Sequence, residues 1–296
     1  MGIAILSGIL ASISEAKDNT ALTQSEDAPQ LTPTKFIACV RKSGQRIKDA
    51  VAGYQSIPVQ VLQNDNVAGT KEADVIILGC KPWMVNDLLD VPGMREALKG
   101  KLLISILAGV PVEQIENALY PDGSIPAEDR CRIIRAMPNT AAIVRESMTI
   151  IETPSPPLPS EWEKLANWIF TRIGRVTHLP PSNMDACTSL AGSGPGFMAL
   201  VLEGITDGGV AMGLPRAEAQ VMAAQVMRGT SAMVQNGEHP ALLRENVCTP
   251  GGCTVGGLLV LEENAVRGSL ARSVREATVV ASQLGQGVMN VNGTRF

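Results

Sequence analysis

The first 180 or so residues alternate short apolar runs with segments of helical periodicity. Helical patterns such as Val112–Leu119 and Ser160–Arg172 lie between the apolar runs. This alternation is typical of a parallel sheet covered by helices. The runs predicted as strands are Lys35–Val40, Val59–Leu62, Val75–Leu78, Leu102–Ile106, Arg132–Met137, Met148–Ile151 and Arg175–His178.

Two local signals add detail to this first half. Ser160 is followed three residues later by Glu163, which predicts a capping box with Ser160 as the N-cap of its helix. The segment Ala21–Pro33 is polar, contains two prolines and lacks periodicity. We therefore expect a surface insertion between the first helix and the next strand.

The pattern changes near Leu179-Pro180-Pro181-Ser182, beyond which no strand pattern appears. Helical patterns rich in alanine, methionine and glycine follow, including Ala217–Val234 and Leu270–Leu284. The sequence therefore predicts two domains, an α/β domain over 1–179 and an all-α domain over 180–296. Small residues recur at helical spacing in the second, which allows either close packing within one chain or an intersubunit helix bundle. These residues are Gly204, Gly208, Ala211, Ala219 and Ala223.

Composition narrows the function classes. The chain has 296 residues, 45% of them hydrophobic and 18% charged, as expected for folded domains with buried cores. A net charge of -4 offers no basic surface for nucleic acid. Six cysteines without a C-x-x-C pair, and only two histidines, argue against a zinc site.

The sequence also bears on location. No apolar run reaches the ~18 residues that a membrane span needs. The apolar segment Met1–Ile13 lacks a basic region, an A-x-A site and arginines, so it resembles neither a signal peptide nor a mitochondrial presequence. Scattered single cysteines suit a reducing compartment. We expect a cytoplasmic protein.

Two glycine-containing corners in the second half are candidate ligand sites. Pro250-Gly251-Gly252-Cys253-Thr254 predicts a turn feeding a helix that begins near Thr254. Free N–H groups at such a helix start suit a small carboxylate, and glycines let a ligand approach the backbone. Ser193-Gly194-Pro195 forms a similar corner. Either corner alone is equally well explained as a helix cap.

Four segments carry a resemblance to a known family. Their order and spacing, from about Gly2 to about Gln283, resemble pyrroline-5-carboxylate reductases. The pair formed by the first two is highly specific. The segments are Leu190–Phe197 with Asp207–Val210 and Met212–Arg216, His239-Pro240 with Asn246–Thr254, Arg135–Thr140, and Gly79-Cys80-Lys81-Pro82.

The resemblance implies an α/β Rossmann-type dinucleotide-binding domain followed by an all-α C-terminal dimerisation domain. It implies reduction of the cyclic imine 1-pyrroline-5-carboxylate to L-proline with NADPH, or NADH, as the last step of proline biosynthesis. The chain would act as a homodimer or larger ring, without nucleic acid or membrane partners. Amides around Gly252, Cys253 and Thr254 would hold the substrate carboxylate, and the Thr254 hydroxyl would bond the ring nitrogen. Ser193 and Gly194 would also bind the substrate, and Ser193 and water are candidate proton relays.

The cofactor would cross the carboxyl ends of the strands. Lys81 could also be a solvated lysine at a strand end. Arg41 and Lys42 follow the strand where an NAD-preferring enzyme often has an acidic residue, and two cations suit the 2′-phosphate of NADPH, although they could be a plain surface pair. The expected cofactor-binding residues are Gly2, Arg41, Lys42, Asn66, Gly79, Cys80, Lys81, Pro82, Ile106, Leu107, Ala108 and Asn246.

One departure from the family matters. Relatives open with a strand and a G-x-G-x-x-G turn, whereas here Gly2 falls on the third glycine of that fingerprint. The missing strand would leave a central slot of the sheet empty. Either the start is an internal methionine, which we favour, or the chain is a shortened form that binds cofactor poorly. An inactive subunit that acts only in assembly is therefore an alternative. A hydroxyacid dehydrogenase is disfavoured, because residues 183–296 hold one histidine, His239, and no lysine.

Overall fold

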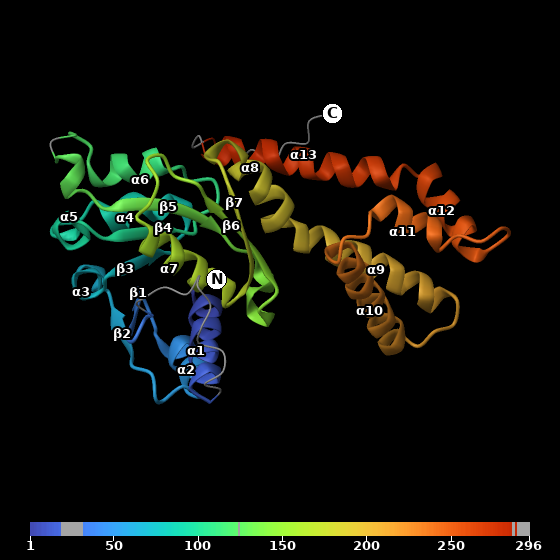
Figure 1. Cartoon of the computed structure of the whole chain (residues 1–296), viewed down its shortest axis with the longest axis horizontal. Helices are drawn as coiled ribbons and strands as arrows, with labels where there is room; N and C mark the ends of the chain where they lie inside the picture. Colours follow the sequence, from blue (N-terminus) through green and yellow to red (C-terminus); the bar gives the residue numbers. More distant parts are fainter. Residues whose placement is uncertain (19–31, 124, 286–287, 289–296) are drawn as a thin grey trace. The chain divides into compact units, whose positions relative to one another are not determined.

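The structure is a computed structural model that describes residues 1–18, 32–123, 125–285 and 288. It divides into two compact units, one of residues 1–192 with 278–296 and the other of residues 193–277. The first is α/β and the second helical (Figure 1). The predicted insertion Ala21–Pro33 falls almost entirely on residues 19–31, outside the described part. The domain limits 1–179 and 180–296 remain a prediction.

Every predicted strand is present in the first unit, with its ends within one residue of the expected position. Strands β5 and β6, however, pair antiparallel to each other, with Ala136 opposite Ile151. The expectation of a parallel sheet is wrong for this pair. A parallel pair needs a crossover of a dozen or more residues. Only residues 138–146 connect these two, so the chain must turn back. The strands are β1 (Phe36–Val40), β2 (Val59–Gln63), β3 (Val75–Leu78), β4 (Leu102–Ser105), β5 (Arg132–Met137), β6 (Ser147–Glu152) and β7 (Gly174–Leu179).

The strands form two separate sheets. One contains β1 and β2, and the other has the order β3-β4-β5-β6-β7 (Figure 1). Since β1 and β3 are not paired, each keeps one free edge, which agrees with the expected empty central slot. The burial of the strands differs accordingly. All four residues of β4 are buried, whereas apolar Phe36, Ile37, Val75 and Ile76 of β1 and β3 stay partly exposed.

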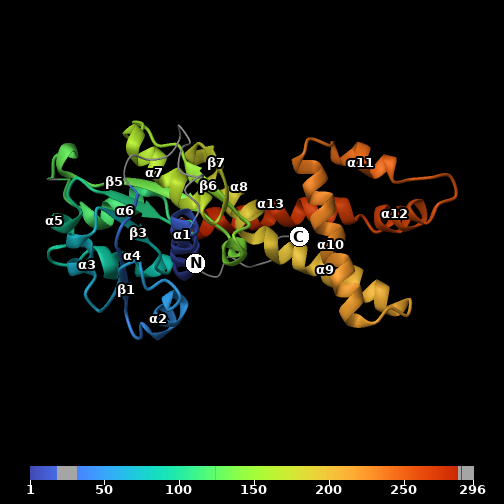
Figure 2. The same ribbon diagram turned by 60° about the horizontal axis from the view of Figure 1, so that its bottom comes forward.

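Helices cover both faces of the five-stranded sheet, because side chains alternate between faces along each strand. On one face, Ile104 packs with Ile5 and Ile9 of α1 (Gly2–Asp18) and with Phe170 of α7 (Ser160–Thr171). On the other, Leu103 packs with α4 (Val85–Leu89), α5 (Met94–Leu98) and α6 (Val112–Leu119), as Figure 2 shows from below. Helices α2 (Gln45–Val51) and α3 (Asn66–Glu72) flank β1 and β2.

The predicted capping box at α7 is wrong. The helix begins at Ser160, and its N-cap is Pro159, whose carbonyl accepts from the N–H groups of Trp162 at 3.0 Å and Glu163 at 3.2 Å. Ser160 is thus already inside the first turn, where its side chain cannot cap. The acidic Glu161 and Glu163 still favour this helix start, because they face the positive end of the helix dipole.

The second unit is built from long helices with little core of its own. Its buried residues are Thr206, Ala219, Ala223 and Leu243. In this unit α9 packs on α10, where Ala219 and Ala223 lie, so these small residues serve packing within the chain. By contrast, a side chain added at Gly204 or Gly208 would meet nothing within 4 Å. The helices are α9 (Gly194–Ala211), α10 (Arg216–Gln235), α11 (Pro240–Asn246), α12 (Cys253–Glu263) and α13 (Val266–Gly285), the last ending in the first unit.

The two halves are joined by short helical turns. The chain leaves β7 through the 3-10 turn η5 (Pro181–Asn183), the short helix α8 (Met184–Cys187) and the π-helical turn η6 (Thr188–Ser193). Along the described chain, no helix combines the length and apolar character needed to cross a membrane.

Candidate active site

The structure brings the segments after β3 and β4 together. Leu78 pairs with Ser105 in the parallel ladder, and the Ile106 N–H donates to the Leu78 carbonyl at 3.0 Å. A methyl group on Gly79 would lie 3.4 Å from Ile106 Cδ1. The predicted groups Gly79–Pro82 and Ile106–Ala108 therefore share one edge of the sheet, where nucleotide ligands bind in such folds.

Not every predicted residue in these segments can face a ligand with its side chain. Leu107 is 2% exposed and belongs to the core under α4 and α6, so only its backbone remains for binding. Ala108 is exposed and can contact a ligand. Burial raises the pKa of the Cys80 thiol, which keeps it protonated at neutral pH.

Lys81 lies in the segment that follows β3, at the same edge of the sheet. It is the N-cap of the 3-10 turn η2 (Pro82–Met84), and its Nζ is 5.9 Å from the ring centroid of Trp83. Trp83 is 77% exposed. The structure thus places the exposed ring of Trp83 beside the Lys81 ammonium group, at the edge where β3 and β4 end. This arrangement suits a nucleotide base and a phosphate.

Arg41 and Lys42 directly follow β1 and are both exposed. Within the described ranges neither forms an ion pair. The neighbouring end of β2 lies beside them, because the Asn64 N–H donates to the Val40 carbonyl at 2.9 Å. Asn66 is the first residue of α3, whose N-cap Asp65 accepts from the Ala68 N–H at 3.1 Å. The predicted cations and Asn66 therefore gather at one end of the β1–β2 pair.

Gly2 is the first residue of α1, and its Cα is open to solvent. The first N–H groups of a helix have no partner within it and attract anions. Further along, a side chain on Gly8 would clash with Ile173, at 2.5 Å from Cγ2. Gly8 therefore allows α1 to pack closely against Ile173, while Gly2 stays accessible at the start of the helix.

In the second unit, the predicted helix start is present. Gly252 is the N-cap of α12, and its N–H donates to the Thr249 carbonyl at 2.8 Å. Gly251 has φ +70°, which favours glycine in this turn. Because Gly252 has no side chain to cap the helix, the N–H groups of Cys253 and Thr254 remain available. Thr254 is partly buried and Cys253 exposed.

Ser193 and Gly194 lie where a π-helical turn continues into an α-helix. Ser193 ends the π-helical turn η6 and precedes α9, and its exposed hydroxyl makes no cap hydrogen bond. Asn246 is an exposed residue at the end of α11. Among the described residues, no hydrogen bond or ion pair joins Ser193 to Gly252–Thr254.

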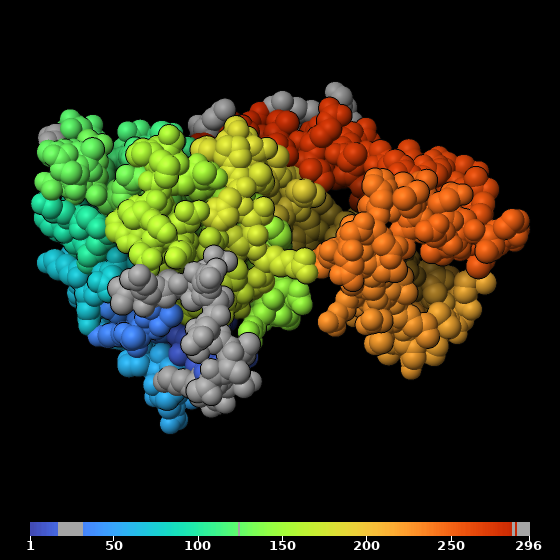
Figure 3. Space-filling view, in the orientation of Figure 1, coloured from blue at the N-terminus to red at the C-terminus, as the bar shows by residue number. Residues whose placement is uncertain are grey.

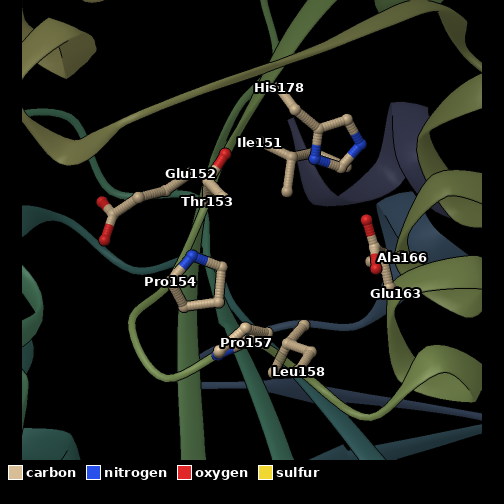
Figure 4. Close-up of a pocket in the computed structure, with 9 residues that line it drawn as sticks. All are labelled: Ile151, Glu152, Thr153, Pro154, Pro157, Leu158, Glu163, Ala166 and His178. Atoms are coloured by element: carbon tan, nitrogen blue, oxygen red, sulfur yellow. The ribbon is translucent and has the colours of Figure 1, made fainter.

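A pocket in the first unit lies elsewhere (Figure 4). It is lined by Ile151, Pro154 and Leu158 with the polar Glu163 and His178, whose Nε2 is 2.7 Å from Asn167 Oδ1. It sits at the end of β6. Because β6 is antiparallel to β5, this end faces the opposite edge from the loops after β3 and β4. The pocket is thus separate from the cofactor edge.

Comparison with known proteins decides the family. Residues 181–284 match the model for pyrroline-5-carboxylate reductase dimerisation, and residues 4–109 match the model described as NADP oxidoreductase coenzyme F420-dependent. The pyrroline-5-carboxylate reductase of Lophium arboricola is 59% identical over 100% of this chain and 94% of its own length. That of Neurospora crassa is 52% identical over 100% and 93%. The chain belongs to the pyrroline-5-carboxylate reductase family.

The fold agrees with this assignment. A crystal structure of the Plasmodium falciparum pyrroline carboxylate reductase with NADP bound matches with a TM-score of 0.76 at 24% identity, covering 96% of this chain and 94% of the other. The predicted fold class, a Rossmann-type domain followed by a helical dimerisation domain, is confirmed.

Sequence analysis missed two residues as site candidates in this reductase family member. Trp83 follows Lys81-Pro82 in a chain with only 3% aromatic residues, so its position was a usable signal. Asn139 lies in a segment that carries the family resemblance, and it is 8% exposed with all its polar groups bonded. Nothing in the sequence alone indicates which carbonyl its amide contacts.

Proposed function

We propose that the chain reduces 1-pyrroline-5-carboxylate to L-proline, with NADPH as the favoured reductant and NADH as a second one. The observation that carries the proposal is the uncapped start of α12 at Gly252, with the Thr254 hydroxyl in the first turn of the helix. The substrate has a carboxylate and a ring nitrogen. The uncapped helix start offers N–H groups for the carboxylate, and the Thr254 hydroxyl can hydrogen-bond the nitrogen. Family membership supports the same reaction.

The residues of the chain act mainly by positioning. The N–H groups of Cys253 and Thr254 hold the carboxylate, and the Thr254 hydroxyl bonds the ring nitrogen. A hydride reaches the imine carbon, the C=N double bond becomes single, and the nitrogen ends with one more proton. Ser193 and water are candidates to deliver that proton. No strong acid is needed to supply this proton when the imine arrives already protonated.

His239 has a structural contact in the second unit. The Nδ1 atom of His239 accepts from the Ala241 N–H at 3.2 Å, so this histidine serves as the N-cap of α11. A hydroxyacid dehydrogenase needs a general base, and residues 183–296 offer no other histidine and no lysine. This supports the imine reductase over that class.

The cofactor edge fits a phosphorylated dinucleotide. When bound, NADPH supplies the hydride. The unpaired Arg41 and Lys42 would face its 2′-phosphate, and Lys81 with Gly79 and Ile106 would line its path at the strand ends. The start of α1 at Gly2 would take pyrophosphate.

Replacing Arg41 and Lys42 together by serine is expected to raise the KM for NADPH by about 10- to 100-fold, because two cations opposite a dianion are lost. The KM for NADH should change less than about twofold. Steady-state kinetics with both cofactors measure this. Arg46→Ser, an exposed cation on α2, is the matched control. Equal effects on both cofactors would contradict the assignment.

Self-association is the second part of the proposal: a homodimer or larger ring built through residues 193–277. Large apolar side chains stay uncovered in this unit, with Leu200 71%, Val221 70% and Val226 66% exposed. In Figure 3, α10 and α11, in orange, show broad uncovered faces. Apolar surface on this scale is typical of subunit interfaces.

The solution mass tests the assembly. We expect at least twice the 31.2 kDa of one chain by light scattering at micromolar concentration. Replacing Leu200 and Val226 by aspartate should shift the mass toward one chain. A wild-type mass of a single chain would refute self-association.

The free state of all six cysteines supports the proposed cytoplasmic location.

The alternative, an inactive subunit that acts only in assembly, is favoured by the division between β1 and β3. The decisive assay is oxidation of NADPH and NADH with pyrroline-5-carboxylate, alongside a 2-hydroxyacid with the oxidised cofactors. Turnover of the imine alone supports the reductase. Turnover of the hydroxyacid alone refutes it, and a folded chain without either activity supports the inactive subunit.

A further inference from the structure

The turn η6 contains one carbonyl, that of Ala191, whose α-helical donor is absent from the sequence. In an α-helix the Ala191 carbonyl would accept from the N–H of residue 195, but residue 195 is proline and has none. The chain adopts a π-helical turn over Thr188–Ser193 at this point. Such turns are rare and concentrate at functional sites. Ser193 and Gly194 follow directly.

Asn139 gives this carbonyl a hydrogen-bond donor from a distant part of the chain. Its Nδ2 donates to the Ala191 carbonyl at 3.0 Å, although the two residues are 52 positions apart. Its Oδ1 accepts from the Ala141 N–H at 3.0 Å, and its own N–H donates to Ser147 Oγ at 3.0 Å. The opposite orientation of the amide would place its donors against the Ala141 N–H, so these contacts determine the orientation.

The support beneath Asn139 is rigid. Ser147 is 2% exposed at the start of β6, and its N–H donates to the Ile173 carbonyl at 2.9 Å. Gly174 packs so closely that a methyl group there would lie 2.0 Å from the Ser147 carbonyl oxygen. The hydrogen bond from Asn139 therefore ties Ala191 to the sheet rather than to a loose loop.

We propose that Asn139 is a positioning residue, which fixes the π-helical turn and thereby sets where Ser193 and Gly194 meet the substrate. This rests on the proposed function. The N-cap contact of Asn139 with Ala141 uses only the amide oxygen. Within the described part of the chain the amide nitrogen donates only to Ala191, so the cap and the tether can be separated by substitution.

Asn139→Asp tests the tether, because aspartate keeps the cap oxygen and loses the donor. We expect the KM for pyrroline-5-carboxylate to rise about tenfold, while the Kd for NADPH stays within about twofold. Amide hydrogen exchange in residues 188–194 should accelerate. Asn183→Asp is the matched control, since Asn183 is exposed and, among the described residues, its side-chain oxygen accepts from the Ser182 hydroxyl.

Asn139→Ser, which retains a cap oxygen without adding charge, should give the same result and replaces the aspartate variant if that does not fold. A lower kcat and melting temperature with unchanged KM and unchanged exchange would overturn the proposal, because that pattern marks a merely structural role. A wild-type chain that does not turn over the imine would refute the proposed function. Exchange in residues 188–194 would still decide the tether, and equal exchange in variant and wild type would overturn it.

Discussion

A chain with an apolar strand ending in G-x-G ahead of Met1 is expected to bind NADPH at least about tenfold more tightly than residues 1–296 alone. The free edges of β1 and β3 can each pair with an added parallel strand. A glycine turn leading into α1 at Gly2 would add backbone N–H groups for the pyrophosphate. Burying Phe36, Ile37, Val75 and Ile76 should also raise the melting temperature.

Titration of NADPH, followed by its fluorescence, measures the affinity of both forms. A second extension with valine in place of the two added glycines is the control. It should stabilise the fold through strand pairing while leaving the NADPH affinity low, because side chains would block the approach of the pyrophosphate. If the G-x-G extension changes neither affinity nor melting temperature, the two sheets do not accept a strand between them.

The second large effect is expected from Thr254→Val. Valine keeps the shape and the helix start but removes the hydroxyl proposed to bond the ring nitrogen. The kcat/KM for pyrroline-5-carboxylate should fall roughly 10- to 100-fold, the range for losing a hydrogen bond to a charged or reacting group. The Kd for NADPH should stay unchanged, since Thr254 contacts only the substrate in this account.

Thr230→Val is the matched control for this prediction. Thr230 is exposed on α10 in the same unit, and its hydroxyl donates to the Val226 carbonyl at 2.9 Å. The same chemical change there should leave kcat/KM within about twofold. Equal losses in the two variants would show that the Thr254 hydroxyl has no special part in the reaction.

The sequence predicted the fold well where local pattern decides. Short apolar runs such as Val75–Leu78 have the period and length of strands, and the structure contains them with the expected bounds. The reversed direction of β6 was not predictable from such runs, since periodicity carries no strand direction. The pattern predicted Ser160 as the N-cap of α7, one residue too late. In the structure the N-cap is Pro159, and Ser160 is the first residue of the helix.

For the candidate site, the local backbone at a segment was easier to predict than the exposure of its side chains. Gly252 does lie at a helix start, as the glycine and proline pattern indicated, whereas Ser193 lies inside a continuous helical segment, where the π-helical turn passes into α9. Leu107 proved to be a core residue, because burial depends on which helices cover the strand end. The role of Asn139 was hidden, since its partner Ala191 is distant in the chain and lies in a π-helical turn.

The most direct test of the central claim follows the hydride itself. Pyrroline-5-carboxylate is incubated with NADPH deuterated at the transferable position, using the chain of 296 residues and the form with the added strand. The account predicts L-proline with one deuterium on the ring carbon that was the imine carbon, one per NADPH oxidised. Unlabelled proline, or no proline from either folded form, would contradict it.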